Sequence, residues 1–132
     1  MSAFVDTSGL LALLDAADAW HARADAVWRR LVEERDLLVT SNYVLLETIA
    51  VAQSRLGLAA ARAVHDDVVP VLQVLWVDAA THQEAMAALL TAGRRRLSLV
   101  DCVSFVLMRK EGLRRAFAFD RHFADQGFEL LR

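Results

Sequence analysis

Four carboxylate residues are conspicuous because each lies in or directly beside an apolar segment: Asp6, Glu47, Asp101 and Asp120. An ionised carboxylate taken out of water loses solvation that only a counter-ion, hydrogen bonds or a metal ion restores. Carboxylate oxygens are also the hard ligands that Mg²⁺ prefers. Because the four acids come from distant segments, they predict a site for a divalent cation.

Two of these acids end short apolar runs. Asp6 follows residues 3–5 and Asp120 follows residues 116–119, and small or polar residues that can begin a helix come next. Both acids are therefore expected at the carboxyl ends of strands. In an open parallel sheet, ligands bind beyond these ends.

The other two acids lie inside apolar runs, Glu47 within residues 43–51 and Asp101 within residues 97–108. Asp101 is expected near the start of a helix that follows a strand, which places it at the same edge of the sheet. Glu47 is expected about two turns into the helix after the second strand, within side-chain reach of that edge. All four carboxylates can therefore converge.

Short β-like runs alternate with helical patterns along the whole chain. Short apolar strands separated by helices need helices on both faces, so we expect a three-layer α/β/α sandwich with a mainly parallel sheet of about five short strands. Strands are expected over residues 3–5, 37–40, 73–77, 116–119 and 128–131, and helices over residues 8–15, 18–34, 41–56, 58–67, 78–92, 98–111 and 121–125.

Composition favours one compact domain over residues 1–132, because 56% of the 132 residues are hydrophobic and 24% are charged. The net charge of -2 gives no general affinity for polyanions, so nucleic acid would have to bind a local patch. The only cysteine, Cys102, excludes an internal disulfide and fits the cytoplasm. Neither a signal peptide nor a membrane span is predicted.

Taken singly, most of these acids also fit a structural role. Asp6 and Asp120 can be helix N-caps or first-turn acids, and the spacing of Ser98 and Asp101 fits a capping box. Glu47 does not fit this alternative, since its helical neighbours at i-4, i-3, i+3 and i+4 are apolar or aromatic.

In order and spacing, these segments resemble the PIN-domain ribonucleases, and more narrowly the VapC-like toxins of bacterial toxin–antitoxin pairs. The resemblance runs the length of the chain. It depends on Val5-Asp6-Thr7-Ser8, Leu45-Leu46-Glu47, Leu97-Ser98-Leu99-Val100-Asp101, Ala118-Phe119-Asp120-Arg121-His122-Phe123 and Gly127-Phe128. Gly9 departs from the small apolar residue usual in the family, and we expect it to weaken the local helix rather than alter the chemistry.

The resemblance implies hydrolysis of RNA phosphodiester bonds by a metal-activated water. It makes Asp6, Glu47, Asp101 and Asp120 the catalytic acids, with Asp6 and Asp101 as direct ligands of Mg²⁺, which Mn²⁺ can replace. Glu47 or Asp120 would orient the water or a second metal ion. Thr7 or Ser8, and Ser98, would support the ligands. The resemblance further implies a homodimer and a small antitoxin whose tail enters the acidic groove.

A run of basic residues, Arg94, Arg95 and Arg96, comes just before Ser98 and can bind RNA phosphates, since arginine forks match phosphate oxygens. The alternative is a solvated loop. His122 follows Asp120 closely, but a surface role is favoured over contact with substrate.

Three other functions remain open. A phosphotransferase of the haloacid dehalogenase type needs a second Asp two residues after the first, where this chain has Ser8. A catalytically silent PIN module that binds proteins is disfavoured by the complete set of acids. A PIN ribonuclease of RNA processing shares the chemistry and differs only in partner and substrate.

Overall fold

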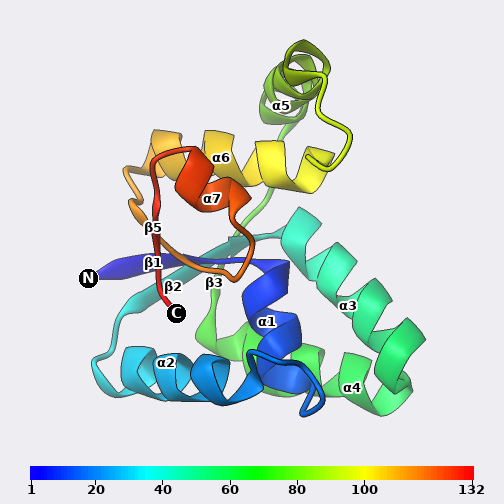
Figure 1. Ribbon diagram of the computed structural model, residues 1–132, viewed down its shortest axis with the longest axis vertical. Helices are drawn as coiled ribbons and strands as arrows, with labels where there is room; N and C mark the ends of the chain where they lie inside the picture. Colours follow the sequence, from blue (N-terminus) through cyan, green and yellow to red (C-terminus); the bar gives the residue numbers. More distant parts are fainter.

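A computed structural model describes residues 1–132 and has a five-stranded sheet between layers of helices (Figure 1). The strand order is β3-β2-β1-β4-β5, and every neighbouring pair is parallel. The predicted α/β/α sandwich is therefore confirmed. In chain order the elements are β1 (Ser2–Val5), α1 (Thr7–Leu14), α2 (His21–Glu33), β2 (Leu37–Ser41), α3 (Asn42–Leu56), α4 (Leu58–Ala63), a π-helical segment η1 (Val64–Val68), a 3₁₀ turn η2 (Val69–Val71), β3 (Gln73–Leu75), α5 (Ala79–Ala92), α6 (Leu99–Glu111), β4 (Arg115–Phe117), α7 (His122–Asp125) and β5 (Glu129–Leu130).

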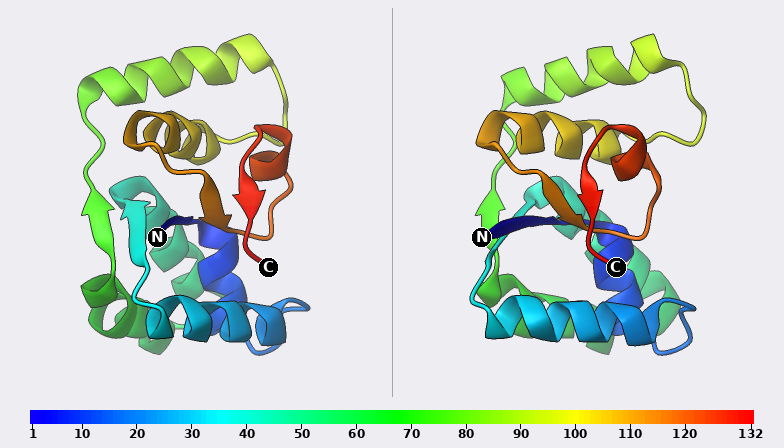
Figure 2. Two further views of the ribbon diagram at one scale, coloured as in Figure 1. Left: turned by 90° about the vertical axis from the view of Figure 1, so that its left-hand side faces the viewer. Right: turned by 60° about the vertical axis from the view of Figure 1, so that its left-hand side comes forward.

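Helices cover the sheet from two sides. Helices α1, α2 and α4 lie below the sheet in Figure 1, whereas α6 and α7 lie above it and α5 packs on the outside of α6 (Figures 1 and 2). Among the largest fully buried side chains are Phe4 of β1, Phe117 of β4 and Phe123 of α7. Because all strands are parallel, the carboxyl ends of β1, β2 and β4 share one edge, where α1 and α3 begin.

The second helix begins at His21 rather than at residue 18. The carboxylates of Asp15 and Asp18 accept hydrogen bonds from the backbone N–H groups of Ala17 (2.9 Å) and Trp20 (2.8 Å). Such local side-chain bonds form turns that compete with a helix. Trp20 therefore lies outside the amphipathic helix, where its ring stacks on Phe119 at 5.2 Å between centroids.

Three strands, β3, β4 and β5, are shorter than predicted, and beyond the ends of β3 and β4 the amide groups find side-chain partners. The N–H of Val77 donates to Oδ1 of Asn42 (2.8 Å), and β3 ends at Leu75. The N–H of Phe119 donates to Oγ of Ser8 (2.9 Å), and β4 ends at Phe117. The helix expected over residues 58–67 ends as α4 at Ala63 and continues as the π-helical and 3₁₀ segments.

Gly9 lies where α1 passes close to the backbone of β4. A Cβ atom at this position would be 2.4 Å from the carbonyl oxygen of Phe117. Any side chain would therefore push α1 away from the sheet, which explains the glycine in a helix that it otherwise weakens. No helix of the structure has both the length and the apolar sequence that crossing a membrane requires.

Candidate active site

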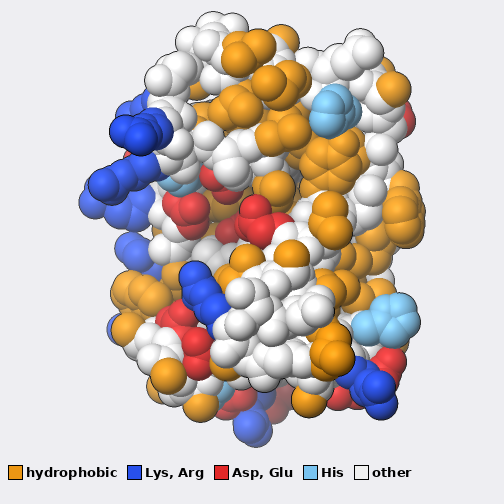
Figure 3. Space-filling view, turned by 90° about the vertical axis from the view of Figure 1, so that its right-hand side faces the viewer, with side chains coloured by type: hydrophobic (Ala, Val, Ile, Leu, Met, Phe, Trp, Pro, Cys, Tyr) orange, Lys and Arg blue, Asp and Glu red, His pale blue; other side chains and the backbone are white.

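The four carboxylates identified in the sequence line one cavity of about 320 Å³ at the carboxyl edge of the sheet. We call this the acidic cavity, and its other lining residues are Thr7, Ser8, Leu11, Arg96 and Ser98. Figure 3 shows acidic side chains gathered near the middle of this face, with hydrophobic side chains above them and basic side chains at the left margin. The structure thus brings together residues from four separate segments of the chain.

Asp6 connects the end of β1 to the start of α1. Its extended backbone (φ -99°, ψ 159°) caps the helix, and its N–H donates to the carbonyl oxygen of Phe117 (3.1 Å). Its Oδ2 accepts hydrogen bonds from the N–H (3.0 Å) and the hydroxyl (2.6 Å) of Ser8. The side chain is consequently fixed at the floor of the cavity, and the residue is only 4% exposed.

Ser8 joins two of the acids. Its hydroxyl donates to Asp6 and also accepts the N–H of Phe119 (2.9 Å), the residue before Asp120. The same side chain therefore determines how the chain leaves β4 and where Asp120 begins. This bond spans 111 residues of sequence, so no local pattern reveals it.

Asp101 occupies the third position of α6 and forms a complete capping box with Ser98. The hydroxyl of Ser98 accepts from the N–H of Asp101, and Oδ2 of Asp101 accepts from the N–H of Ser98, both at 3.1 Å. The capping interpretation is thus correct for Asp101 and Asp6. The helix caps use only Oδ2 of each residue, and Oδ1 of each has no hydrogen bond within the protein.

Glu47 reaches the cavity from the middle of α3, where its side chain is half-buried. Below it, Thr7 holds α1 against α3: its hydroxyl accepts a hydrogen bond from Thr48 (3.1 Å) and donates to the carbonyl of Val44 (3.4 Å). Thr7 therefore fixes the position of α1, which follows Asp6, relative to α3, which carries Glu47.

The cavity holds more negative charge than its surroundings compensate. Burial raises the pKa of Asp6 to about 7, against the lowering effect of the Ser8 hydrogen bonds, and the charges of Asp101 and Asp120 raise it further. Burial is also the main cause of the raised pKa values of Glu47 and Asp101. Of the four acids, only Asp120 has a basic side chain within 4 Å, that of His122 at 3.7 Å. Hard oxygen donors without a buried cation are the donor set that suits Mg²⁺ or Mn²⁺.

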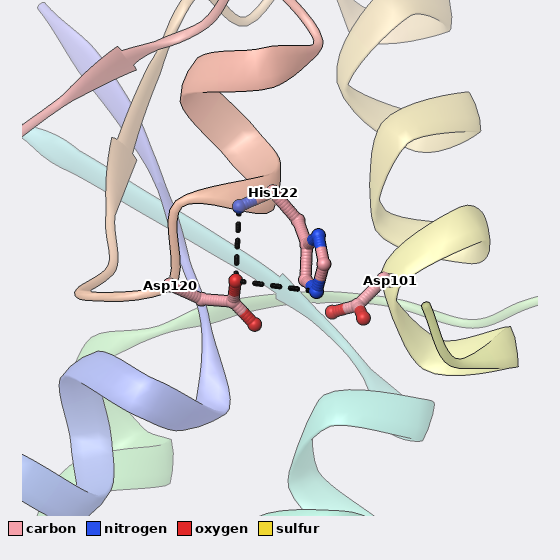
Figure 4. A group of neighbouring side chains, drawn as sticks. All are labelled: Asp101, Asp120 and His122. Atoms are coloured by element: carbon pink, nitrogen blue, oxygen red, sulfur yellow. Dashed lines mark hydrogen bonds and ion pairs between the residues drawn. The ribbon is translucent and has the colours of Figure 1, made fainter. Parts of the chain in front are cut away.

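His122 lies beside this site, near Asp101 and Asp120, although the sequence favoured a surface role for it. Its side chain is 22% exposed, and its Nε2 lies 3.7 Å from Oδ1 of Asp120 (Figure 4). Oδ1 of Asp120 also accepts the backbone N–H of His122 (2.9 Å). The sequence signal was its position two residues after Asp120, in a turn that keeps the two side chains together.

Of the three arginines in the basic run, only Arg96 lines the acidic cavity. Arg94 and Arg95 lie on the exposed loop before it. Of the three tryptophans, Trp28 packs on Phe117 of the core, and Trp76 is 78% exposed.

Comparison with known proteins gives consistent results. The PIN domain family profile matches residues 3–129. A curated relative, the 23S rRNA-specific endonuclease VapC20 of Mycobacterium tuberculosis, is 38% identical over 130 residues, which is 98% of this chain and 97% of the relative. The crystal structure of this VapC20, described as a sarcin-ricin loop cleaving toxin, superposes with a TM-score of 0.86 over 96% of both chains.

A more distant solved structure, FitAcB from Neisseria gonorrhoeae, has a TM-score of 0.70 at 15% identity and covers 98% of this chain and 96% of its own. At this identity the likeness concerns the fold alone. The profile match and the 38% identity extend over nearly the whole chain. The chain therefore belongs to the PIN-domain family, in its VapC-like branch.

Proposed function

We propose that this protein is a metal-dependent endoribonuclease that acts as the toxin of a toxin–antitoxin pair, with Asp6, Glu47, Asp101 and Asp120 as its catalytic carboxylates. The observation that supports this proposal is the convergence of the four acids on one cavity in a chain of the VapC-like family. We further propose that residues 1–132 form one domain and that the protein acts in the cytoplasm, where its RNA substrate is found.

Asp6 and Asp101 would hold the cation, Mg²⁺ or Mn²⁺, through the oxygens that capping leaves free. Ser8 and Ser98 keep these carboxylates in place by the hydrogen bonds that form the caps. When bound, the cation neutralises charge on the scissile phosphate and lowers the pKa of its bound water.

The remaining groups act on water and substrate. The carboxylates of Glu47 and Asp120 line the same cavity and can accept hydrogen bonds from an attacking water, which orients its lone pair toward phosphorus. Arg96 lies at the cavity wall, where its guanidinium can pair with a phosphate oxygen of the RNA. Arg94 and Arg95, on the same loop, would add affinity for the neighbouring backbone.

For the substrate, the relatives suggest structured ribosomal RNA. VapC20, at 38% identity, is named for action on 23S rRNA and on the sarcin-ricin loop. Loops expose unstacked bases and phosphates that an open cavity can reach, whereas paired strands do not. We therefore propose a ribosomal RNA loop as the target.

An RNA cleavage assay tests the proposed activity. Purified protein is incubated with total RNA in MgCl₂ or MnCl₂, with EDTA as the control, and the new RNA ends are sequenced. We expect cleavage at one or a few positions of ribosomal RNA that EDTA abolishes. Absence of cleavage with either metal ion, or cleavage that persists in EDTA, would contradict the proposal.

The antitoxin would block the acidic cavity. Because this cavity has an excess of negative charge, a segment that places a basic side chain in it would neutralise the carboxylates without a metal ion. The test is co-expression with the small open reading frame immediately upstream of the gene: we expect a stable complex without RNA cleavage. A co-purified complex that cleaves RNA as fast as the free toxin would contradict this role.

A second copy of the chain would cover the apolar groove between α3 and β3. This groove has a volume of about 600 Å³, and Leu46 (71% exposed) and Trp76 (78% exposed) lie on its wall. Exposed apolar surface of this kind is characteristic of an interface. We expect Trp76→Glu to convert a dimer to a monomer in sedimentation velocity, while Val32→Glu, on the exposed face of α2, leaves the dimer intact. A wild type that sediments as a monomer would exclude the homodimer.

A further inference from the structure

We propose that the imidazole of His122 is a nitrogen ligand of the cation bound in the acidic cavity, and that it gives this site a preference for Ni²⁺ and Co²⁺ over Mg²⁺. The inference rests on the proposed function, because it assumes that a divalent cation binds the carboxylates. It goes beyond that function by assigning a fifth residue and a metal preference to the site.

The position of His122 supports this assignment. Figure 4 shows its imidazole between the carboxylates of Asp101 and Asp120, which come from α6 and from the loop after β4. One nitrogen of His122 and one oxygen of each carboxylate all lie within 4.8 Å of one another. In an octahedral shell with ligand bonds of about 2.1 Å, opposite ligand atoms are about 4.2 Å apart. At most one pair of the three can be opposite, and adjacent ligand atoms are about 3.0 Å apart, so closing movements of up to about 2 Å bring all three groups into one shell.

The ring nitrogens of His122 are free for this role. Nδ1 of His21 is hydrogen bonded to the carbonyl of Ala12, and Nδ1 of His82 is hydrogen bonded to the hydroxyl of Tyr43. The ring of His122 has no hydrogen bond, and its nearest partner is the Asp120 oxygen at 3.7 Å. At 22% exposure the side chain is largely shielded from solvent, beside two residues that line the cavity, Asp101 and Asp120.

The chain itself holds His122 close to Asp120. The backbone N–H of His122 donates to Oδ1 of Asp120, so the two side chains share one turn. The next residue, Phe123, is fully buried and anchors α7 in the core. The backbone of His122 is therefore held beside Asp120, and only the side-chain torsions remain to be fixed on binding.

The donor chemistry determines the metal preference. Carboxylates and water suit Mg²⁺, whereas imidazole nitrogen suits Ni²⁺ and related transition ions, whose affinity rises along the Irving–Williams series. A site made of oxygens alone would lack this additional discrimination. Removing the imidazole should therefore weaken the binding of Ni²⁺ and Co²⁺ much more than the binding of Mg²⁺.

Metal titration without RNA tests the inference. Wild type, His122→Asn and the matched control His65→Asn, an exposed histidine outside the cavity, are titrated with MgCl₂, CoCl₂ and NiCl₂ by isothermal calorimetry. We expect His122→Asn to lose at least ~10-fold in affinity for Ni²⁺ and Co²⁺, the smallest effect usual even for groups that only support a ligand. For Mg²⁺ we expect His122→Asn to lose less than about 3-fold in affinity. The control His65→Asn should bind all three ions with wild-type affinity.

Two results would overturn the assignment: equal affinities in wild type and His122→Asn, or an equal loss for all three ions, which a purely structural role would produce. If His122→Asn does not fold, the proton spectrum of the wild-type Co²⁺ complex decides. A strongly shifted, solvent-exchangeable imidazole N–H signal supports a histidine ligand, and its absence contradicts one. A wild type that binds none of the ions would contradict the metal-dependent function itself.

Discussion

At the scale of single residues, the site combines two uses of the same carboxylate. Asp6 and Asp101 each cap a helix with one oxygen and direct the other toward the acidic cavity. Asparagine caps a helix about as well as aspartate. Replacing Asp by Asn at these positions therefore removes the charge and largely keeps the cap, which separates the two roles.

The first prediction uses this separation in the metal-free protein. Asp6→Asn should raise the melting temperature at about pH 8 by a few degrees, because it removes a buried charge that Asp101 and Asp120 repel. Asp78→Asn is the matched control, since Asp78 caps α5 through the N–H of Thr81 and lies outside the cavity. There the hydrogen bonds of Thr81 lower the pKa of the carboxyl, so losing its charge should leave stability unchanged or slightly reduced.

Thermal melts in EDTA measure both variants. A variant Asp6→Asn that melts below the wild type would contradict the prediction, because it would show that the loss of the cap outweighs the cost of burying the Asp6 charge beside Asp101 and Asp120.

The second prediction concerns pH. The pKa of Asp6 rises from its ordinary value of 3.8 to about 7 in the folded protein, so the folded state binds a proton that the unfolded state has released. Its contribution to stability is complete below pH 3.8 and is lost as pH rises through about 7. The advantage of Asp6→Asn over the wild type should therefore be present at about pH 8 and largely absent at about pH 5.

Melting curves of the two metal-free proteins at both pH values check this dependence. A stability difference that is the same at both pH values would show that Asp6 has an ordinary pKa.

At the scale of elements, the sequence was most informative where the determinants are local. Ser41, Asp78 and Ser98 accept hydrogen bonds in the first turns of α3, α5 and α6, and each is visible as a polar residue before an apolar run. The meeting of Asp6 and Asp120 could also be predicted, because parallel strands bring their carboxyl ends to one edge. Asp101 was expected on a helix that follows a strand, which is wrong, because α6 follows helix α5.

Determinants distant in sequence could not be predicted. The end of β4 depends on the bond from Phe119 to Ser8, and the end of β3 depends on the bond from Val77 to Asn42. The place of His122 at the cavity likewise depends on the approach of α6, which carries Asp101, to the loop after β4. None of these partners is a sequence neighbour.

The third prediction tests the approach of α1 to β4. In an ordinary helix Gly→Ala stabilises by up to ~1 kcal/mol, but Gly9→Ala places a Cβ atom 2.4 Å from the carbonyl oxygen of Phe117. The backbone must shift, so we expect the free energy of unfolding to fall by ~1–3 kcal/mol. Urea unfolding measures the change, and a stabilised Gly9→Ala would show that the two elements are farther apart.

The fourth prediction compares two arginines of the loop before α6. Arg96→Ala should weaken RNA binding and reduce the slope of log affinity against log salt by about 0.7, the value for one phosphate contact with single-stranded nucleic acid. Arg94→Ala, which removes the same charge outside the cavity, should have the smaller effect. Both affinities are measured with Asp101→Asn as the background, so that the RNA stays intact. Equal effects of the two variants would indicate a diffuse electrostatic role for the loop.

At the scale of the whole molecule, the parallel sheet brings the residues of the site together. Its parallel order places the ends of β1 and β4 beside the starts of α1 and α3, and α6 crosses the same edge. The acidic cavity therefore depends on the global fold, although each acid belongs to a separate short motif. The VapC20 structure shares this fold at a TM-score of 0.86.

The fifth prediction concerns the central claim, that the acidic cavity is where RNA is cleaved. Asp101→Asn keeps the capping box with Ser98 and removes one ligand charge, so its circular dichroism and melting should remain those of a folded protein. The decisive measurement is the rate of RNA cleavage in MgCl₂ by Asp101→Asn relative to wild type. We predict a decrease of at least ~100-fold, as expected when charge stabilisation of the transition state is lost. Cleavage by the folded variant at the wild-type rate would contradict this site.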